Sequence, residues 1–179
     1  VPLTNEEVRW VSVARLGVQP GDTVWDVGAG TGAVTFELAR KAMDGAVFAV
    51  ERNTEAIELI AQNRQKLGGF NVHIVPGHAP EVLADLPKPN CVFVGGSGGN
   101  MRKIIETALM KNPKARIVVN AIALETLQET QRLFAEFGLQ QVEITQLSAA
   151  RGKSIGCYTM MTANNPVFIL SGKGAKYGE

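Results

Sequence analysis

Residues 25 to 33, Trp25-Asp26-Val27-Gly28-Ala29-Gly30-Thr31-Gly32-Ala33, join a short apolar strand to a helix. The strand is predicted at Thr23 to Val27. The helix is predicted at Thr31 to Met43, because apolar residues recur there at helical spacing. Glycines at a strand-to-helix turn let the backbone bend sharply and approach a ligand closely, since no Cβ stands in the way. The stretch therefore predicts a ligand-binding turn from Gly28 to Gly32.

A second apolar strand supports this interpretation. It is predicted at Ala46 to Val50 and ends in Glu51, about 20 residues beyond the glycine turn. A carboxylate at that position can accept both hydrogen bonds from a ribose diol. The glycine turn and the acidic strand end together predict a nucleoside-bearing cofactor.

Two cofactor types fit this pattern. Gly28 to Ala33 also satisfies the dinucleotide fingerprint G-x-G-x-x-G/A. Three features favour S-adenosylmethionine. Asp26 would repel a pyrophosphate but suits the ammonium of a methionine moiety, Gly32 completes a G-x-G-x-G run, and a helical segment precedes the first strand. A tight turn without a ligand is the plainer alternative, which the agreement of turn, acid and β/α alternation disfavours.

The composition sets limits on the class of protein. The chain has 179 residues, of which 45% are apolar and 20% charged, and its formal net charge is +1. These values are typical of a globular protein with a full core, and we expect one domain over residues 1–179. A balanced charge argues against a broad nucleic-acid-binding surface. The sequence has no apolar stretch long enough to span a membrane and no signal-peptide pattern, so we expect a cytoplasmic protein without a membrane partner.

Two cysteines, Cys91 and Cys157, lie in strand-like segments, where we expect them to be buried. Their spacing fits neither a metal site nor a disulfide framework, and we expect no bound metal.

Helical and strand patterns alternate along the rest of the chain. Further helices are predicted at Glu6–Leu16, Thr54–Leu67, Met101–Met110 and Leu124–Phe137, and further strands at Val72–Val75, Asn90–Gly95 and Ala115–Ile122. Two last strands, around Gln141–Leu147 and Cys157–Leu170, have no helical pattern between them and suggest an antiparallel hairpin at the sheet edge.

This order predicts a doubly wound, Rossmann-like α/β fold with a seven-stranded, mostly parallel sheet and an antiparallel last strand. It is the class I fold of S-adenosylmethionine-dependent methyltransferases. Residues 1–22 would form an N-terminal helical segment, residues 23–170 the core, and residues 171–179 a frayed tail. Ligands collect beyond the carboxyl ends of the strands in such sheets.

The chain resembles the cobalamin-pathway precorrin-6B methyltransferases, which methylate carbon 15 and decarboxylate the ring C acetate. The resemblance covers nearly all of residues 3 to 170. The first glycine loop is common to many methyltransferases, whereas a second loop at Gly95–Gly99 is more specific in combination with other motifs. The motifs are Thr4-x-Glu6-Glu7-Val8-Arg9, Asp26-Val-Gly28-Ala-Gly30-Thr-Gly32, Val94-Gly-Gly-Ser-Gly-Gly99, Val119-Asn120-Ala121-Ile122 with Leu124-Glu125-Thr126, Ala150-Arg151-Gly152 and Asn165-Pro166-Val167.

The resemblance implies a set of cofactor-binding residues, with S-adenosylmethionine contacting Thr4, the first glycine loop, Glu51 on the ribose and Ala79 beside the adenine. Thr4 also fits an N-cap of the first helix, with Glu7 as its capping-box partner. The full expected set is Thr4, Asp26, Gly28, Ala29, Gly30, Thr31, Gly32, Glu51, Arg52, His78, Ala79 and Gly95.

One position departs from the family pattern. The family usually carries Gly-Asp-Ala-Pro-Glu where this chain has Gly77-His78-Ala79-Pro80-Glu81. A neutral histidine can accept the adenine amino proton, less strongly than aspartate, and a protonated one cannot. His78 as a solvent-facing loop residue is the alternative, and His73 is expected to be a packed or surface residue.

The implied substrate is a flat tetrapyrrole that carries several carboxylates. Backbone amides of the second loop could hold an anion, and Ser97 could add a hydroxyl. Arg151 and Lys153, expected in the loop before the last strand, are the preferred carboxylate anchors, with Arg102 weaker. Arg151 and Arg102 could equally be solvated, and Asn120 could be a satisfied polar residue. The expected substrate-binding set is Gly96, Ser97, Gly98, Gly99, Asn120, Arg151 and Lys153.

No catalytic residue is assigned, because an electron-rich ring carbon is already a nucleophile and needs no dedicated base. An S-adenosylmethionine-dependent methyltransferase acting on RNA or protein remains the alternative function. The second loop lacks the aromatic residue that would stack a flipped base, which disfavours nucleic acid. The resemblance also implies a homo-oligomer, and fusion to or action with a carbon 5 precorrin methyltransferase, which would suit the start at Val1.

Overall fold

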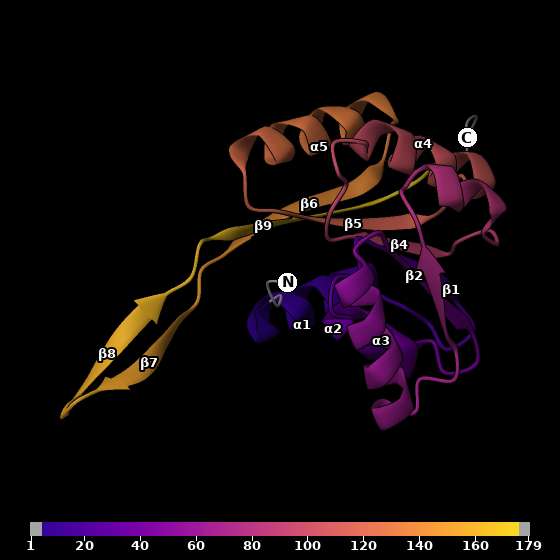
Figure 1. Ribbon diagram of the computed structural model, residues 1–179. Coiled ribbons are helices and arrows are strands. Elements are labelled where there is room, and N and C mark those ends of the chain that lie inside the picture. Colours follow the sequence, from indigo (N-terminus) through magenta and orange to yellow (C-terminus); the bar gives the residue numbers. More distant parts are fainter. Residues whose placement is uncertain (1–4, 176–179) are drawn as a thin grey trace.

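A seven-stranded sheet with helices on both faces forms the body of the molecule (Figure 1). The computed structural model describes residues 5–175. The strand order is β3-β2-β1-β4-β5-β9-β6, with β9 antiparallel to both of its neighbours. The strands are β1 Thr23–Val27, β2 Ala46–Glu51, β3 Val72–Pro76, β4 Cys91–Val94, β5 Arg116–Ala121, β6 Gln140–Leu147 and β9 Val167–Lys173. The predicted doubly wound fold with an antiparallel last strand is confirmed.

The helices form two layers. The first layer contains α1 Glu6–Leu16, α2 Ala33–Lys41 and α3 Thr54–Leu67, and the second contains α4 Met101–Lys111 and α5 Leu124–Glu136 (Figure 1). Side chains on β1 alternate between the layers: Val24 packs with the first helices and Trp25 with the second. Burial on both faces explains why the central strands are almost continuously apolar.

The switch in strand order lies between β1 and β4. Val27, the last residue of β1, pairs with Val50 on β2 and with Val94 on β4. The connections that follow β1 and β4 lead to α2 in one layer and α4 in the other, so the two glycine loops diverge from adjacent strand ends. This is the point at which α/β sheets bind ligands.

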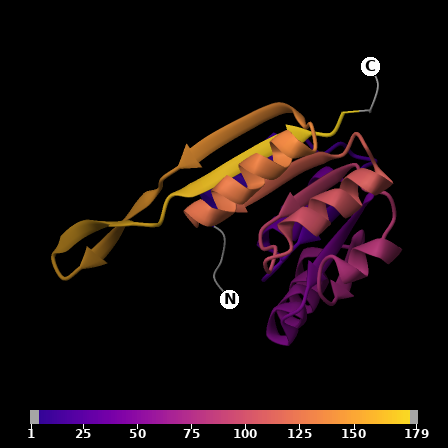
Figure 2. The ribbon, with the colours of Figure 1, turned by 90° about the horizontal axis from the view of Figure 1, so that it is seen from above.

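The carboxyl-terminal part differs from the prediction. The predicted strand Cys157–Leu170 is two strands, β8 Tyr158–Ala163 and β9, separated by Asn164-Asn165-Pro166. A further strand, β7 Ala150–Ile155, pairs with β8 in a separate two-stranded sheet. This hairpin projects from the body as an arm (Figures 1 and 2). Proline lacks the N–H that a continuous strand needs, which explains the break.

Three smaller expectations were also wrong. Ser171–Lys173 belong to β9 rather than to a frayed tail, because they pair with Arg116–Val118 across the sheet. Cys157 is exposed, because it occupies the turn at the tip of the arm. Cys91 is buried as predicted. The N-cap of α1 is Asn5, one residue later than expected, and Thr4 lies outside the described residues.

Within residues 5–175 no helix combines the length and apolar character needed to cross a lipid bilayer.

Candidate functional site

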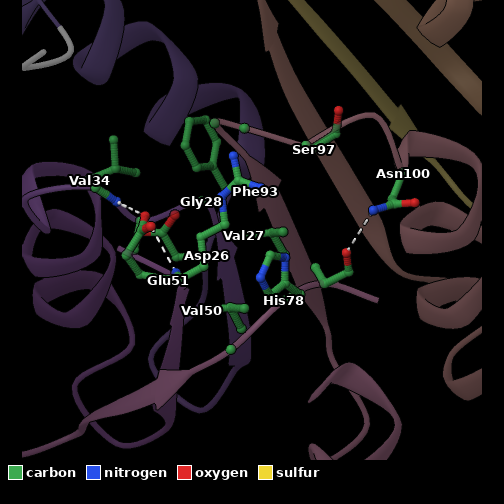
Figure 3. Close-up of a pocket in the computed structure, with 18 of the residues that line it drawn as sticks. Asp26, Val27, Gly28, Val34, Val50, Glu51, His78, Phe93, Ser97 and Asn100 are labelled. Atoms are coloured by element: carbon green, nitrogen blue, oxygen red, sulfur yellow. Dashed lines mark hydrogen bonds between the residues drawn. The ribbon is translucent and has the colours of Figure 1, made fainter. Parts of the chain in front are cut away.

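A crevice of about 490 Å³ opens at the carboxyl ends of β1, β2 and β4. Its walls come from the first glycine loop, the end of β2, the loop after β3 and the second glycine loop (Figure 3). Asp26 and Glu51 lie on one side of it, and Ser97 and Asn100 on the other. It is lined by Asp26, Val27, Gly28, Ala29, Gly30, Thr31, Ala33, Val34, Val50, Glu51, Arg52, Gly77, His78, Ala79, Phe93, Gly95, Gly96, Ser97, Gly98 and Asn100.

The first glycine loop is a left-handed turn held by β2. Gly28, Gly30 and Gly32 have φ angles of 75°, 57° and 83°, a region that other residues rarely adopt. The amides of Gly28 and Ala29 donate to the carbonyl of Val50 at 2.9 and 3.1 Å. The loop is therefore fixed by backbone bonds.

Glu51 ties the end of β2 to this loop. Its Oε2 accepts a hydrogen bond from the Gly30 amide at 2.8 Å, and its Oε1 accepts from the amides of Arg52 and Asn53 at 2.8 and 2.9 Å. Each carboxylate oxygen has about two acceptor positions. Oε2 therefore retains capacity toward the crevice.

Asp26 lies in the floor of the crevice, and its side chain is fully buried. Its Oδ2 accepts a hydrogen bond from the Thr35 hydroxyl at 2.5 Å, whereas Oδ1 is buried without a partner. Burial raises the pKa of the Asp26 carboxyl to about 7; the Thr35 hydroxyl opposes this rise and the charge of Glu51 adds to it. A buried acceptor without a donor costs free energy, so this position favours an incoming cationic donor.

The second glycine loop packs directly against the first. The amides of Gly95 and Gly96 donate to the carbonyl of Val27 at 2.9 and 3.3 Å. A Cβ on Gly28 would lie 2.7 Å from the nitrogen of Gly96. The two loops therefore form one continuous surface along the crevice.

The next three amides of this loop are free. Among the described residues, no hydrogen bond involves the N–H of Ser97, Gly98 or Gly99. The predicted anion-binding amides are therefore limited to those of Ser97, Gly98 and Gly99, because the amides of Gly95 and Gly96 already donate to Val27. Gly99 belongs to this free run but does not line the crevice.

The remaining wall contains His78, which was predicted, and Phe93 and Asn100, which sequence reasoning did not assign to the site. Phe93 precedes the second loop, and no sequence signal distinguished it from the other apolar residues of β4. Asn100 is the N-cap residue of α4, but its side chain makes no cap bond and instead donates to the carbonyl of Ala79 at 3.2 Å. His78 is exposed in the wall. His73 stacks on Phe48 at the surface, with ring centroids 4.8 Å apart, as expected.

Several predicted substrate residues lie away from the crevice. Arg151 and Lys153 lie on the strand β7 rather than in a loop, and neither lines the crevice. The Arg151 guanidinium is paired with Glu7 at 2.7 Å and Glu6 at 3.3 Å. Arg102 forms two hydrogen bonds with Glu136 on α5, at 2.7 and 2.6 Å.

Asn120 also lies outside the lining of the crevice. It is half-buried at the end of β5, and its Oδ1 lies 3.0 Å from the Ser12 hydroxyl of α1. The observed contact fits the plainer prediction of a satisfied polar residue.

Among residues 5–175 no cluster of three or more histidine, cysteine, aspartate or glutamate side chains could hold a metal ion.

Residues 1–173 match the family model described as a precorrin methyltransferase domain. A protein of Pyrobaculum calidifontis, named probable cobalt-precorrin-6B C(15)-methyltransferase (decarboxylating), is 42% identical over 173 residues, which are 96% of this chain and 88% of that protein. The crystal structure of a precorrin-6y C5,15-methyltransferase from Geobacter metallireducens has a TM-score of 0.90 at 35% identity, covering 96% and 90% of the two chains. The structure of precorrin 8W decarboxylase from Methanobacterium thermoautotrophicum has a TM-score of 0.89 at 38% identity, covering 96% and 92%.

Proposed function

The chain belongs to the precorrin methyltransferase family, and from that premise we propose that it transfers a methyl group from S-adenosylmethionine to carbon 15 of a precorrin and removes the carboxylate of the ring C acetate. One observation carries the proposal. The turn residues Gly28 to Thr31, the acid Glu51 and the side-chain-poor loop after β4 line a single crevice, whereas Gly32 lies outside its lining. The crevice thus combines a nucleoside-binding half with a flat half that leaves room for a planar macrocycle.

The residues present fit the proposed cofactor. The unpartnered Oδ1 of Asp26 would accept a hydrogen bond from the methionine ammonium, and the free capacity of Glu51 Oε2 would serve a ribose hydroxyl. Thr31, Gly28 and Gly30 would lie along the sulfonium side, where a Cβ on Gly28 would already collide with Gly96. Ala79 and His78 would border the adenine, and Thr4 remains a proposed contact outside the described residues.

When bound, S-adenosylmethionine supplies an electrophilic methyl group on a positively charged sulfur. The protein's task is to align the ring carbon with that methyl group, which can contribute several kcal/mol through proximity alone. The backbone bonds that join both glycine loops to Val27 and Val50 provide the necessary rigidity. No base is required, because the conjugated ring carbon is nucleophilic by itself.

The decarboxylation step places a different requirement on the crevice. When the bond to the carboxylate breaks, its electron pair moves into the conjugated ring, and a proton is added afterwards. Partial exclusion of water from the leaving carboxylate would favour this step. The apolar wall provided by Phe93 and Val27, both buried, suits that role.

The proposal includes assembly of the chain with copies of itself. Every residue of β7 and β8 is exposed, and the arm carries Ile155, Tyr158, Met160 and Met161 on its surface. An isolated two-stranded hairpin is marginally stable in water. Packing of the arms between subunits of a homo-oligomer would bury these side chains.

Two further elements complete the proposal. The name of the Geobacter protein includes a carbon 5 activity. We therefore also propose that this chain is fused to, or acts with, a carbon 5 methyltransferase. The free thiols of Cys91 and Cys157 fit a reducing compartment, so we place the enzyme in the cytoplasm.

The decisive experiment is incubation of the full chain with methyl-labelled S-adenosylmethionine and the precorrin substrate, with and without cobalt, followed by mass spectrometry. We expect a product that has gained one labelled methyl group and lost one carbon dioxide. An unchanged precorrin, together with label transferred to RNA or to a peptide, would instead support the alternative methyltransferase functions.

A further inference from the structure

Arg52 is an exposed arginine in the wall of the crevice, at the point where β2 ends. Its guanidinium lies against the second glycine loop, since a Cβ added to Gly98 would be 3.6 Å from Arg52 Nη1. Arg52 therefore reaches from the cofactor half of the crevice to the loop that borders the substrate half.

The charge of this guanidinium is not neutralised within the described chain. Among residues 5–175, no ion pair or hydrogen bond involves the guanidinium of Arg52. Its neighbour Glu51 has three backbone donors on its carboxylate. By contrast, Arg151 and Arg102 both have carboxylate partners outside the crevice.

The loop beside Arg52 also offers unused donors. Within residues 5–175 the amides of Ser97, Gly98 and Gly99 have no hydrogen-bond partner, and Gly98 and Gly99 have left-handed φ angles of 56° and 84°. Consecutive free amides next to a guanidinium provide both charge and directional hydrogen bonds for a carboxylate.

We propose that Arg52, together with the free amides of Ser97 and Gly98, anchors a carboxylate of the tetrapyrrole substrate, and that this is a carboxylate the product retains. The inference rests on the proposed function and replaces Arg151 as the main substrate anchor. The same residue was expected to bind the cofactor, so the two roles require different tests.

The choice of a retained carboxylate follows from the chemistry of decarboxylation. Loss of carbon dioxide moves negative charge from the carboxylate into the ring. A guanidinium bound to the leaving carboxylate would stabilise the ground state more than the transition state and so slow the step. An anchor on a different side chain holds the macrocycle without this penalty.

The test compares Arg52→Gln with Arg52→Lys and with the control Arg40→Gln. Arg40 is exposed on α2 and does not line the crevice, so its substitution changes the net charge equally. We expect Arg52→Gln to raise the precorrin KM about tenfold, with Arg52→Lys intermediate because it keeps the charge but loses the planar fork. The dissociation constant of S-adenosylhomocysteine and the ratio of decarboxylated to methylated product should stay unchanged in both variants.

A binding measurement separates this inference from the proposed reaction. Uroporphyrin, a planar tetrapyrrole with carboxylates around its rim, is titrated into wild-type protein and the variants while its fluorescence is followed. We expect affinity to fall in Arg52→Gln and not in Arg40→Gln, whether or not the wild type turns over a precorrin. Equal affinities in all proteins, or an absence of wild-type binding, would overturn the inference. A parallel loss of S-adenosylhomocysteine affinity would make Arg52 a cofactor residue instead, and a selective change in the product ratio would place it on the leaving carboxylate.

Discussion

The backbone of Gly28 lies in direct contact with that of Gly96, so closely that a Cβ on Gly28 would be 2.7 Å from both the nitrogen and the oxygen of Gly96. These residues are far apart in the sequence, yet they bring the first glycine loop and the loop after β4 into one surface. The contact has a measurable consequence, because it leaves no room for the smallest side chain.

We expect Gly28→Ala to abolish binding of S-adenosylhomocysteine in calorimetry and to lower the melting temperature. The added methyl group would force the two loops apart, in addition to the roughly 1–2 kcal/mol that a left-handed residue costs. Gly17→Ala is the matched control, since Gly17 has a φ of 61° but no atom within 4 Å of the added Cβ. A similar decrease in both variants, with cofactor binding intact, would show that only backbone strain matters at Gly28.

The buried acid Asp26 predicts a pH dependence. Its folded-state pKa of about 7 lies above the ordinary value of 3.8, so the folded apo protein holds this proton more tightly than the unfolded chain does. The resulting stabilisation is present below pH 4 and is lost as the pH rises toward 7, by an amount on the order of a few kcal/mol. We therefore expect Asp26→Asn to flatten this part of the stability curve and to stabilise the apo protein at pH 8.

The same substitution should weaken cofactor binding. An ammonium group favours the ionised form of Asp26, so wild-type affinity for S-adenosylhomocysteine should rise between pH 6 and pH 8, as measured by calorimetry. Asp26→Asn should lose both the affinity and its pH dependence. The ammonium assignment would be refuted by a variant that binds as tightly as the wild type at pH 8.

Glu51→Gln tests the tie between β2 and the first glycine loop. The amide group of glutamine would direct a donor toward backbone N–H groups that now find an acceptor. We expect an affinity for S-adenosylhomocysteine lower by about 10- to 100-fold, since charge-assisted bonds are worth roughly 1.5–3 kcal/mol. The exposed control Glu55→Gln on α3 should bind S-adenosylhomocysteine with wild-type affinity. A loss of affinity in this control as well would show that the net charge, rather than the contacts of Glu51, determines binding.

Arg151 predicts a local effect on the arm. It is paired with Glu6 and Glu7 of α1, and a backbone hydrogen bond at Glu7 together with the bond from Arg151 holds the pKa of Glu7 below the ordinary value. An exposed ion pair contributes little to global stability, because water and salt screen its charges. We expect Arg151→Ala to leave the melting temperature nearly unchanged while hydrogen exchange accelerates in β7 and β8. Arg132→Ala, which removes a comparable exposed pair with Glu136, should leave exchange in the arm as it is.

Removal of the arm tests the proposed assembly. Leu147 and Val167 face each other in the β6–β9 ladder, so residues 148–166 can be replaced by an Asn-Gly turn. We expect light scattering to report a monomer that still binds S-adenosylhomocysteine. An unchanged oligomer would exclude the arm as the contact surface.

Local patterns were sufficient to predict most of the sheet. The strand at Thr23–Val27 agrees with the structure at both ends, because a strongly apolar run is followed at once by glycines. The prediction failed between residues 148 and 170. Both β8 and β9 are rich in strand-forming residues, and only the intervening Pro166 indicates that they are separate.

The candidate site, like the sheet, was predicted only in part. The positions of the first glycine loop and of Glu51 at the crevice were predicted, since glycine spacing and the end of a strand reveal short-range geometry. The surroundings of Arg151 were not, because its partner Glu7 is 144 residues away in the chain. Likewise, no pattern in the sequence distinguishes the free amides of Ser97 to Gly99 from the amides of Gly95 and Gly96, which donate hydrogen bonds to the carbonyl of Val27.

The carbonyl of Val27 has a consequence for redesign of the site. It accepts hydrogen bonds from the amides of both Gly95 and Gly96, and Val27 itself leads into the first glycine loop. A side chain exchanged at Ser97 would therefore leave the joint between the two loops in place. Gly98 and Gly99 offer less freedom, because their left-handed φ angles of 56° and 84° disfavour any other residue.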